Sequence, residues 1–148
     1  MNNGKSFLTL AQRLATQSSD NAALRSAISR AYYGAYNYGR HLLRQTGFSH
    51  IANKSRNHGE VWRYLQNCGE ANVEKAGHKL ADLESDRVKA DYNMDERKFS
   101  NLKNIQFGLG IAQEIVSEFD HCITSSQKKE IVTQGMKQYE RKISTPSS

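Results

Sequence analysis

Three polar groups stand in apolar stretches of this sequence, and their side chains could do chemistry if the fold brought them together. Arg30 lies beside a Tyr-Tyr pair, His58 opens a short apolar stretch, and Arg87 closes a longer one shortly before Asp91 and Tyr92. A buried guanidinium needs a carboxylate, a carbonyl or a bound anion as its partner. Arg30 and Arg87 could each pair with Asp91, or together bind a phosphate.

The same groups also allow a purely structural interpretation. Arg30, Arg87 and Asp91 would then form a buried ion-pair network, with Tyr92 donating a hydrogen bond. Removing one partner of such a network costs about 3–5 kcal/mol whatever the protein does. His58 is equally open, because a histidine in the first turn of a helix can be a solvated surface group.

The sequence does not indicate a metal or cofactor site. The five histidines are scattered, without an HxxxH or HExxH pattern on a helix, and there is no glycine-rich phosphate loop. Cys68 and Cys122 form no CxxC pattern. One disulfide between them is possible, but we expect a reduced intracellular protein that binds neither metal nor cofactor.

The elements that must position these groups follow from apolar periodicity. Helices are expected over 5–17, 21–45, 58–68, 70–90, from near 95 to about 123, and 127–143. A turn is expected at Asp91-Tyr92-Asn93, and a basic loop over 48–56. Ser19 or Asp20 should cap the second helix, which ends near Gly47, and Asn57 should form a capping box with Glu60.

Apolar residues at helical spacing predict which side of each helix is buried. The predicted buried positions are Phe7, Leu10, Ala11 and Leu14 in the first helix, Leu24, Ala27, Ile28, Ala31, Ala35, Tyr38 and Leu42 in the second, and Ile131, Met136 and Tyr139 in the last. The second helix carries too many tyrosines for one stripe. We therefore expect it to be central and covered on several sides, although a tyrosine row could also stack nucleic-acid bases.

Length and composition favour one all-α domain. The chain has 148 residues and a single proline, Pro146, so no helix upstream is interrupted by proline. We expect one helical domain over 1–143 and a disordered tail over 144–148. No apolar run resembles a signal peptide or reaches the roughly 20 residues of a membrane span. The expected location is the cytoplasm, with no membrane partner.

The net charge of +6 is unevenly distributed. Residues 1–58 contain eight lysines and arginines but one acid, Asp20, whereas residues 59–124 contain eight basic and twelve acidic residues. A basic N-terminal half suggests a polyanion such as RNA or an acidic protein surface as partner. Arg30, Lys54 and Arg56 are the cations that we expect to contact RNA phosphates.

Three segments resemble the HEPN superfamily, in its small stand-alone branch. SRAYYGAYNYGRHLL is similar to the second helix of HEPN domains, HGEVW to the element that follows it, and LESDRVKADY to the branch's Leu-x-x-x-Arg-x-x-Ala-Asp-Tyr signature. Their order and approximate spacing agree over residues 20–119. The resemblance implies an up-and-down helical bundle with four to five core helices, followed by a C-terminal helix. It also implies a homodimer in which the polar ends of two bundles form a cleft.

The resemblance further implies a function. Many HEPN proteins are metal-independent endoribonucleases that act as toxins or in phage defence, often beside a nucleotidyltransferase antitoxin or another defence subunit. Their usual catalytic pattern is an arginine followed after four to six residues by a histidine. The histidine assists attack of the ribose 2′-hydroxyl on the phosphate, and the arginine neutralises the developing charge.

This chain departs from that pattern. Arg87 matches the arginine, but Tyr92 stands where the histidine is expected, and an ordinary tyrosine is a poor base at neutral pH. Arg44 and His50 have the right spacing but straddle a helix end, so we attribute their match to chance. The expected catalytic set is therefore Arg87, His58, Asp91 and Tyr92. The alternative is a catalytically degenerate HEPN module that binds RNA or a protein without turnover.

Overall fold

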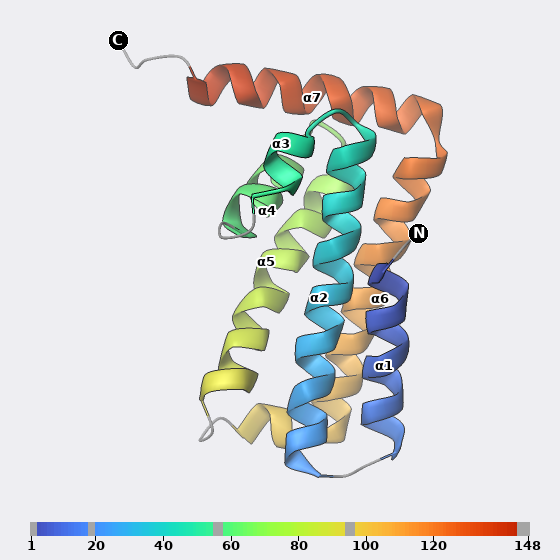
Figure 1. The fold of residues 1–148 in the computed structure, drawn as a ribbon, viewed down its shortest axis with the longest axis vertical. Coiled ribbons are helices and arrows are strands. Elements are labelled where there is room, and N and C mark those ends of the chain that lie inside the picture. The colour runs from blue at the N-terminus through green and yellow to red at the C-terminus, as the bar shows by residue number, and fades with distance from the viewer. Residues whose placement is uncertain (1–2, 18–19, 55–57, 94–96, 145–148) are drawn as a thin grey trace.

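The chain folds into a helical bundle, which confirms the predicted all-α class. The computed structural model describes residues 3–17, 20–54, 58–93 and 97–144. These residues form α1 (Asn3–Gln17), α2 (Asn21–Gln45), α3 (Ser49–Ala52), α4 (His58–Gln66), α5 (Ala71–Tyr92), a 3-10 helix η1 (Arg97–Ser100), α6 (Leu102–Thr124) and α7 (Ser126–Ser144). The long helices α1, α2, α5 and α6 run alternately up and down, α3 and α4 lie beside one end, and α7 crosses that end (Figure 1). No helix of the described residues is long and apolar enough to cross a membrane.

Helix α2 is the central element, and its sequence explains both of its ends. The Asp20 carboxylate accepts a hydrogen bond from the Ala22 amide at 3.2 Å, which caps the start. After Gln45 the chain turns at Gly47, whose φ of 92° favours glycine. The bounds predicted for this helix are thus confirmed.

The tyrosines of α2 are mainly part of the core. Tyr32, Tyr36 and Tyr38 are all buried, and Tyr33 is half-buried. Helix α2 packs against α1, α4, α5 and α6, so it is covered on several sides as predicted. The apolar positions predicted to face the core are all buried: Leu24, Ala27, Ile28, Ala31, Ala35, Tyr38 and Leu42.

Two predicted boundaries are wrong because side chains act on the backbone nearby. A turn was expected at residues 91–93, but α5 continues through Tyr92. There the Arg25 guanidinium donates hydrogen bonds to the carbonyls of Ala90 and Asn93, at 3.1 and 2.9 Å, and stabilises the last turn. The helix expected from near 95 is split after η1, where the Asn101 side chain caps α6.

Two predicted core residues are also wrong. Leu10 of α1 is 37% exposed and Ile131 of α7 is 44% exposed. The buried stripe of α1 is shifted to Leu8, Ala11 and Ala15, and the buried residues of α7 are Val132 and Met136. The loop expected over 48–56 contains the short helix α3. Arg56, the Asn57 cap and residues 145–148 of the predicted tail lie outside the described residues.

Helix α7 approaches the bundle closely at a glycine. A Cβ atom added to Gly135 would lie 1.7 Å from the carbonyl oxygen of Cys68 and 3.0 Å from the amide nitrogen of Gly69. Both atoms belong to the backbone of the turn after α4, so neither can move aside cheaply. Cys68 and Cys122, near this junction, are free thiols, and burial raises their pKa values to about 12 and about 11. They are therefore unreactive core residues.

We predict that Gly135→Ala lowers the free energy of unfolding by about 1–3 kcal/mol, because the new methyl group must displace backbone. The matched control is Gly110→Ala in α6, where an added Cβ meets no atom within 4 Å. That change should raise stability by roughly 0.5–1 kcal/mol through helix propensity. Urea unfolding followed by circular dichroism measures the free energy of unfolding of both variants. Equal changes in the two would contradict the close contact at Gly135.

Candidate functional site

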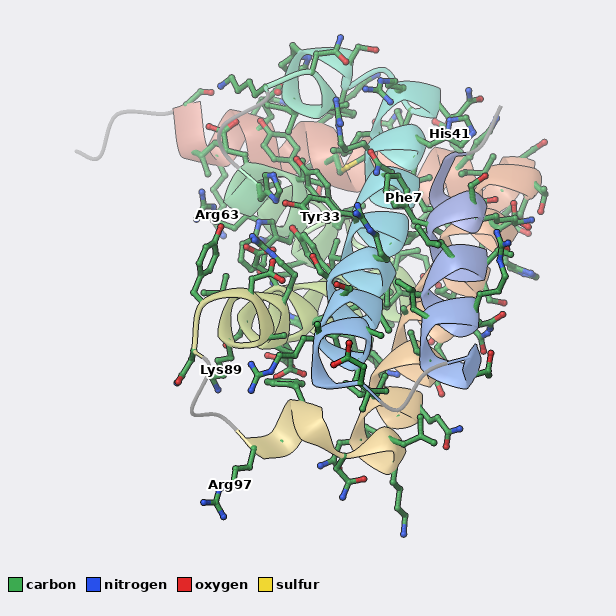
Figure 2. The ribbon with its side chains drawn as sticks, turned by 60° about the horizontal axis from the view of Figure 1, so that its bottom comes forward. Phe7, Tyr33, His41, Arg63, Lys89 and Arg97 are labelled. Carbon is green, nitrogen blue, oxygen red and sulfur yellow. The ribbon has the colours of Figure 1, made fainter. Side chains whose placement is uncertain are left out.

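His58 lies where the start of α4 meets the tyrosine side of α2. Its Nδ1 is 2.8 Å from the Tyr32 hydroxyl. The imidazole stacks on the Tyr36 ring, with centroids 4.1 Å apart and an interplanar angle of 13°. Tyr33, which lies on the side of α2 facing α4 (Figure 2), meets the imidazole edge-on at 6.2 Å. The half-buried ring is thus held by three tyrosines of α2, two adjacent in the chain and the third one turn further on.

Arg87 approaches the same tyrosines from α5. Its guanidinium carbon lies 5.6 Å from the Tyr32 ring centre and 5.5 Å from that of Tyr33. Nη2 is 2.6 Å from Glu84 Oε1, and Nη1 is 3.4 Å from Asp91 Oδ2. The side chain of Arg87 is only 12% exposed. The fold therefore brings His58 and Arg87 together within one protomer, but with the arginine already bound by two carboxylates.

Asp91 joins α5 to α2. Besides Arg87, its Oδ2 accepts a hydrogen bond from the Ser29 hydroxyl at 3.2 Å. Tyr92 is 76% exposed and lies outside this cluster. Lys54 is exposed, and its ammonium group forms an ion pair with Glu60 at 3.1 Å. Of the predicted residues that the structure describes, His58, Arg87 and Asp91 are brought together, whereas Tyr92 and Lys54 are not.

Arg30 was expected to be buried, and this prediction is wrong. The residue is exposed, and no ion pair joins it to Asp91. The buried arginine of α2 is Arg25, with 6% of its surface exposed. At about 100° per residue, Arg30 lies roughly 200° around the helix from the buried Ile28, whereas Arg25 lies only about 60° from it. The angle around the helix could therefore have predicted from the sequence that Arg25 is buried and Arg30 is exposed.

Electrostatics keep the cluster in defined protonation states. Burial lowers the pKa of His58; the positive charges of Arg87 and Arg40 lower it further, and Glu84 opposes them. Burial, and then the Glu84 carboxylate, raise the pKa of the Tyr32 hydroxyl. The imidazole is therefore neutral near pH 7 and the hydroxyl is protonated. Burial alone would lower the pKa of Arg87, but its hydrogen bond to Glu84 outweighs this and raises it.

The tautomer of His58 decides what the imidazole can do. If Nδ1 accepts a hydrogen bond from the Tyr32 hydroxyl, the ring proton is on Nε2, and Nε2 can only donate. If Nδ1 carries the proton and donates to Tyr32, Nε2 has a free lone pair and can act as a base. In either case the negative charge of Glu84 helps to keep the Tyr32 hydroxyl protonated.

Next to His58 runs a row of three arginines, of which only Arg30 was predicted from the sequence as a phosphate contact. Arg30, Arg40 and Arg44, which we call the α2 arginine stripe, follow one side of α2 with Tyr33 and Asn37 between them. The spacing 30, 33, 37, 40 and 44 alternates three and four residues, a pattern visible in the sequence. The residues of this side are half-buried or exposed.

Within the described part of the chain, no carboxylate forms an ion pair with the stripe. Arg40 donates to the carbonyl of Ala52 at 2.6 Å, and its guanidinium lies 5.8 Å from the ring centre of Tyr36. Arg44 donates to the side-chain oxygen of Asn53. His50, the second member of the Arg-x5-His pair with Arg44, instead contacts Glu140 at 2.7 Å. Arg40 and the imidazole of His58 thus both lie next to the ring of Tyr36.

Comparisons of this chain with protein-family models, curated proteins and solved structures gave no match. The described residues contain no group of three or more histidine, cysteine, aspartate or glutamate side chains placed to bind a metal ion. The chemistry of the site must therefore be argued from its own side chains.

We predict that Arg87→Met lowers the free energy of unfolding by about 3–5 kcal/mol, because Glu84 would remain buried without its cation. Tyr92→Ala should change stability by less than about 0.5 kcal/mol, since the tyrosine is exposed. Chemical unfolding measures both. A mild effect of Arg87→Met would contradict the structural role of its ion pair.

We predict that Arg40→Gln raises the pKa of His58, because it removes a positive charge that disfavours the imidazolium. Arg63→Gln is the matched control: Arg63 is an exposed cation on α4 that is not among the charges acting on His58. The His58 ring proton followed by NMR between pH 4 and 9 gives the result. A fall in pKa in Arg40→Gln, or an equal rise in the control, would show that Arg40 does not face the ring.

Proposed function

We propose that this chain binds single-stranded RNA along the α2 arginine stripe and cleaves it without a metal ion at His58. The observation that carries the proposal is a set of three arginines without carboxylate partners beside a neutral imidazole. Unpaired guanidinium groups bind phosphates, and interleaved tyrosine and asparagine side chains can contact bases and sugars. The basic N-terminal half of the sequence supports the same partner.

The contacts of His58, Arg40 and Arg87 support the following roles. His58 Nε2 accepts the proton of the ribose 2′-hydroxyl as the oxygen attacks phosphorus, and the 5′-oxygen leaves with a proton from water. Arg40 neutralises the charge that develops on the phosphate, because Arg87 is already occupied by Glu84 and Asp91. Tyr32 and Glu84 orient the imidazole. Arg87 is then a positioning residue.

The resemblance to HEPN-domain proteins supports this proposal and extends it. A chain of this kind would act in the cytoplasm as a toxin or in phage defence, with an antitoxin, a nucleotidyltransferase or another defence subunit as partner.

The contacts of Arg87 favour a second function, which is RNA binding without cleavage. Arg87, which matches the family's catalytic arginine, is buried under two tyrosine rings and bound by two carboxylates. Such an arginine is unavailable to a substrate. If His58 likewise only anchors α4 to Tyr32 and Tyr36, the chain is a module that binds RNA through its stripe without turnover.

Binding and cleavage are tested separately, with chelator present. We expect Arg40→Ala and Arg44→Ala to weaken binding of a labelled single-stranded RNA and each to reduce the slope of log K against log salt by about 0.7. Lys137→Ala, an exposed cation on α7, should leave both unchanged. RNA binding that is equal in all four proteins would overturn the proposed binding surface.

Cleavage is followed on gels with the same RNA. His58→Gln should retain binding and lose cleavage by about 10²-fold or more, the usual contribution of a general base. Circular dichroism of each variant controls for folding. Binding by the wild type without any cleavage would establish the second function in place of the first.

A further inference from the structure

Helix α6 exposes a large aromatic side chain that its own chain leaves uncovered. Phe107 is 71% exposed, although it lies in the second turn of a bundle helix whose other side is buried. One turn further on, Gly110 has no atom within 4 Å of the position of a Cβ. Glycine inside a helix costs about 1 kcal/mol relative to alanine. Nothing in the described part of the chain packs against Gly110 closely enough to require it.

The residues around this pair form a pattern of charge and size. Lys103, Phe107, Gly110 and Glu114 follow one another at four, three and four residues, so they share one side of α6. Lys103, Phe107 and Glu114 are exposed, and Gly110 is partly exposed. We call these four residues the α6 stripe. Its order is cation, large aromatic, small residue, carboxylate.

Hollows flank the stripe on both sides. One, of about 340 Å³, lies between α6 and α1 and is lined by residues that include Ala15, Leu109 and Gly110. The other, of about 670 Å³, lies between α6 and α5 and is lined by Lys75, Lys79, Gly110 and Glu114, among others. Gly110 thus borders both hollows, and a large side chain placed on it would have room on either side.

We infer that two copies of this chain associate through their α6 stripes, antiparallel about a two-fold axis. An axis midway between Phe107 and Gly110 places each phenylalanine over the partner's glycine. The same axis places Lys103 opposite the partner's Glu114. A two-fold interface requires such reciprocal pairs, in which one residue contacts the other in both directions. A parallel arrangement would instead set like charges and the two phenylalanines against each other.

This surface leaves the candidate RNA site free. Helices α2 and α6 pack against each other, and α6 lies behind α2 in Figure 1. Ile28 of α2 faces Gly108 of α6, and the residues of the α2 arginine stripe lie roughly 120–200° around the helix from Ile28. The two arginine stripes of a dimer would therefore face outward on opposite sides. This differs from the shared cleft that the family resemblance implies, and it does not depend on RNA binding.

The test is sedimentation equilibrium of the full chain between roughly 1 µM and 1 mM, which covers weak to moderate dissociation constants. The wild type should dimerise within it. Phe107→Glu and Gly110→Leu should each raise the dimer dissociation constant at least about 100-fold, by removing the aromatic contact or blocking its place. Ile131→Glu, at an exposed residue of α7, is the matched control and should leave the constant unchanged.

A charge exchange tests the antiparallel register. Lys103→Glu and Glu114→Lys should each weaken the dimer about tenfold, because each dimer contains the pair twice, and the double variant should recover most of the loss. Glu114 also pairs with Lys79 of its own chain at 3.0 Å, so thermal unfolding is measured for every variant. A monomeric wild type, or a dimer insensitive to Phe107→Glu, would overturn the inference. A dimer without recovery in the double variant would overturn the register.

Discussion

The ion pair of Arg87 with Glu84 beneath the rings of Tyr32 and Tyr33 is the interaction on which the rest of the site depends. At 2.6 Å and little exposed, it places a compensated charge between α5 and α2. Because Glu84 also acts on the Tyr32 hydroxyl, and that hydroxyl meets His58, the pair influences a group on a third helix. Loss of the arginine would leave a buried carboxylate beside the tyrosine that orients the imidazole.

The arginines of this protein fall into two groups, according to the groups of the fold that bind their guanidinium. Arg87 is paired inside the fold with two carboxylates, although its Nε is buried without a hydrogen-bond partner, and Arg25 donates to helix-end carbonyls. The α2 arginine stripe contacts only neutral groups in the described part of the chain. A paired arginine stabilises the structure, whereas an arginine with unused charge attracts anions. This distinction moves the proposed phosphate contact from Arg87 to Arg40.

The exposed sides of α2 and α6 differ in chemistry, and each suits a different partner. Helix α2 turns cations, tyrosine and asparagine toward solvent, as a polyanion site requires. Helix α6 turns outward a phenylalanine and a glycine between opposite charges, as a self-complementary interface requires. Since α2 and α6 pack against each other, the same core that orients one surface orients the other.

The sequence by itself determined the helical class, the bounds of α2 and its buried face, because periodicity and capping are local properties of the chain. It also singled out His58, Arg87 and Asp91 as unusual. It misplaced Arg30, Leu10 and Ile131, and it missed Glu84, Tyr32 and Arg40 as members of the site. Only the tertiary structure decided those points, since burial and the partner of a charge depend on which helix packs alongside. Spacing along one helix gives its faces, but it does not tell which face another helix covers.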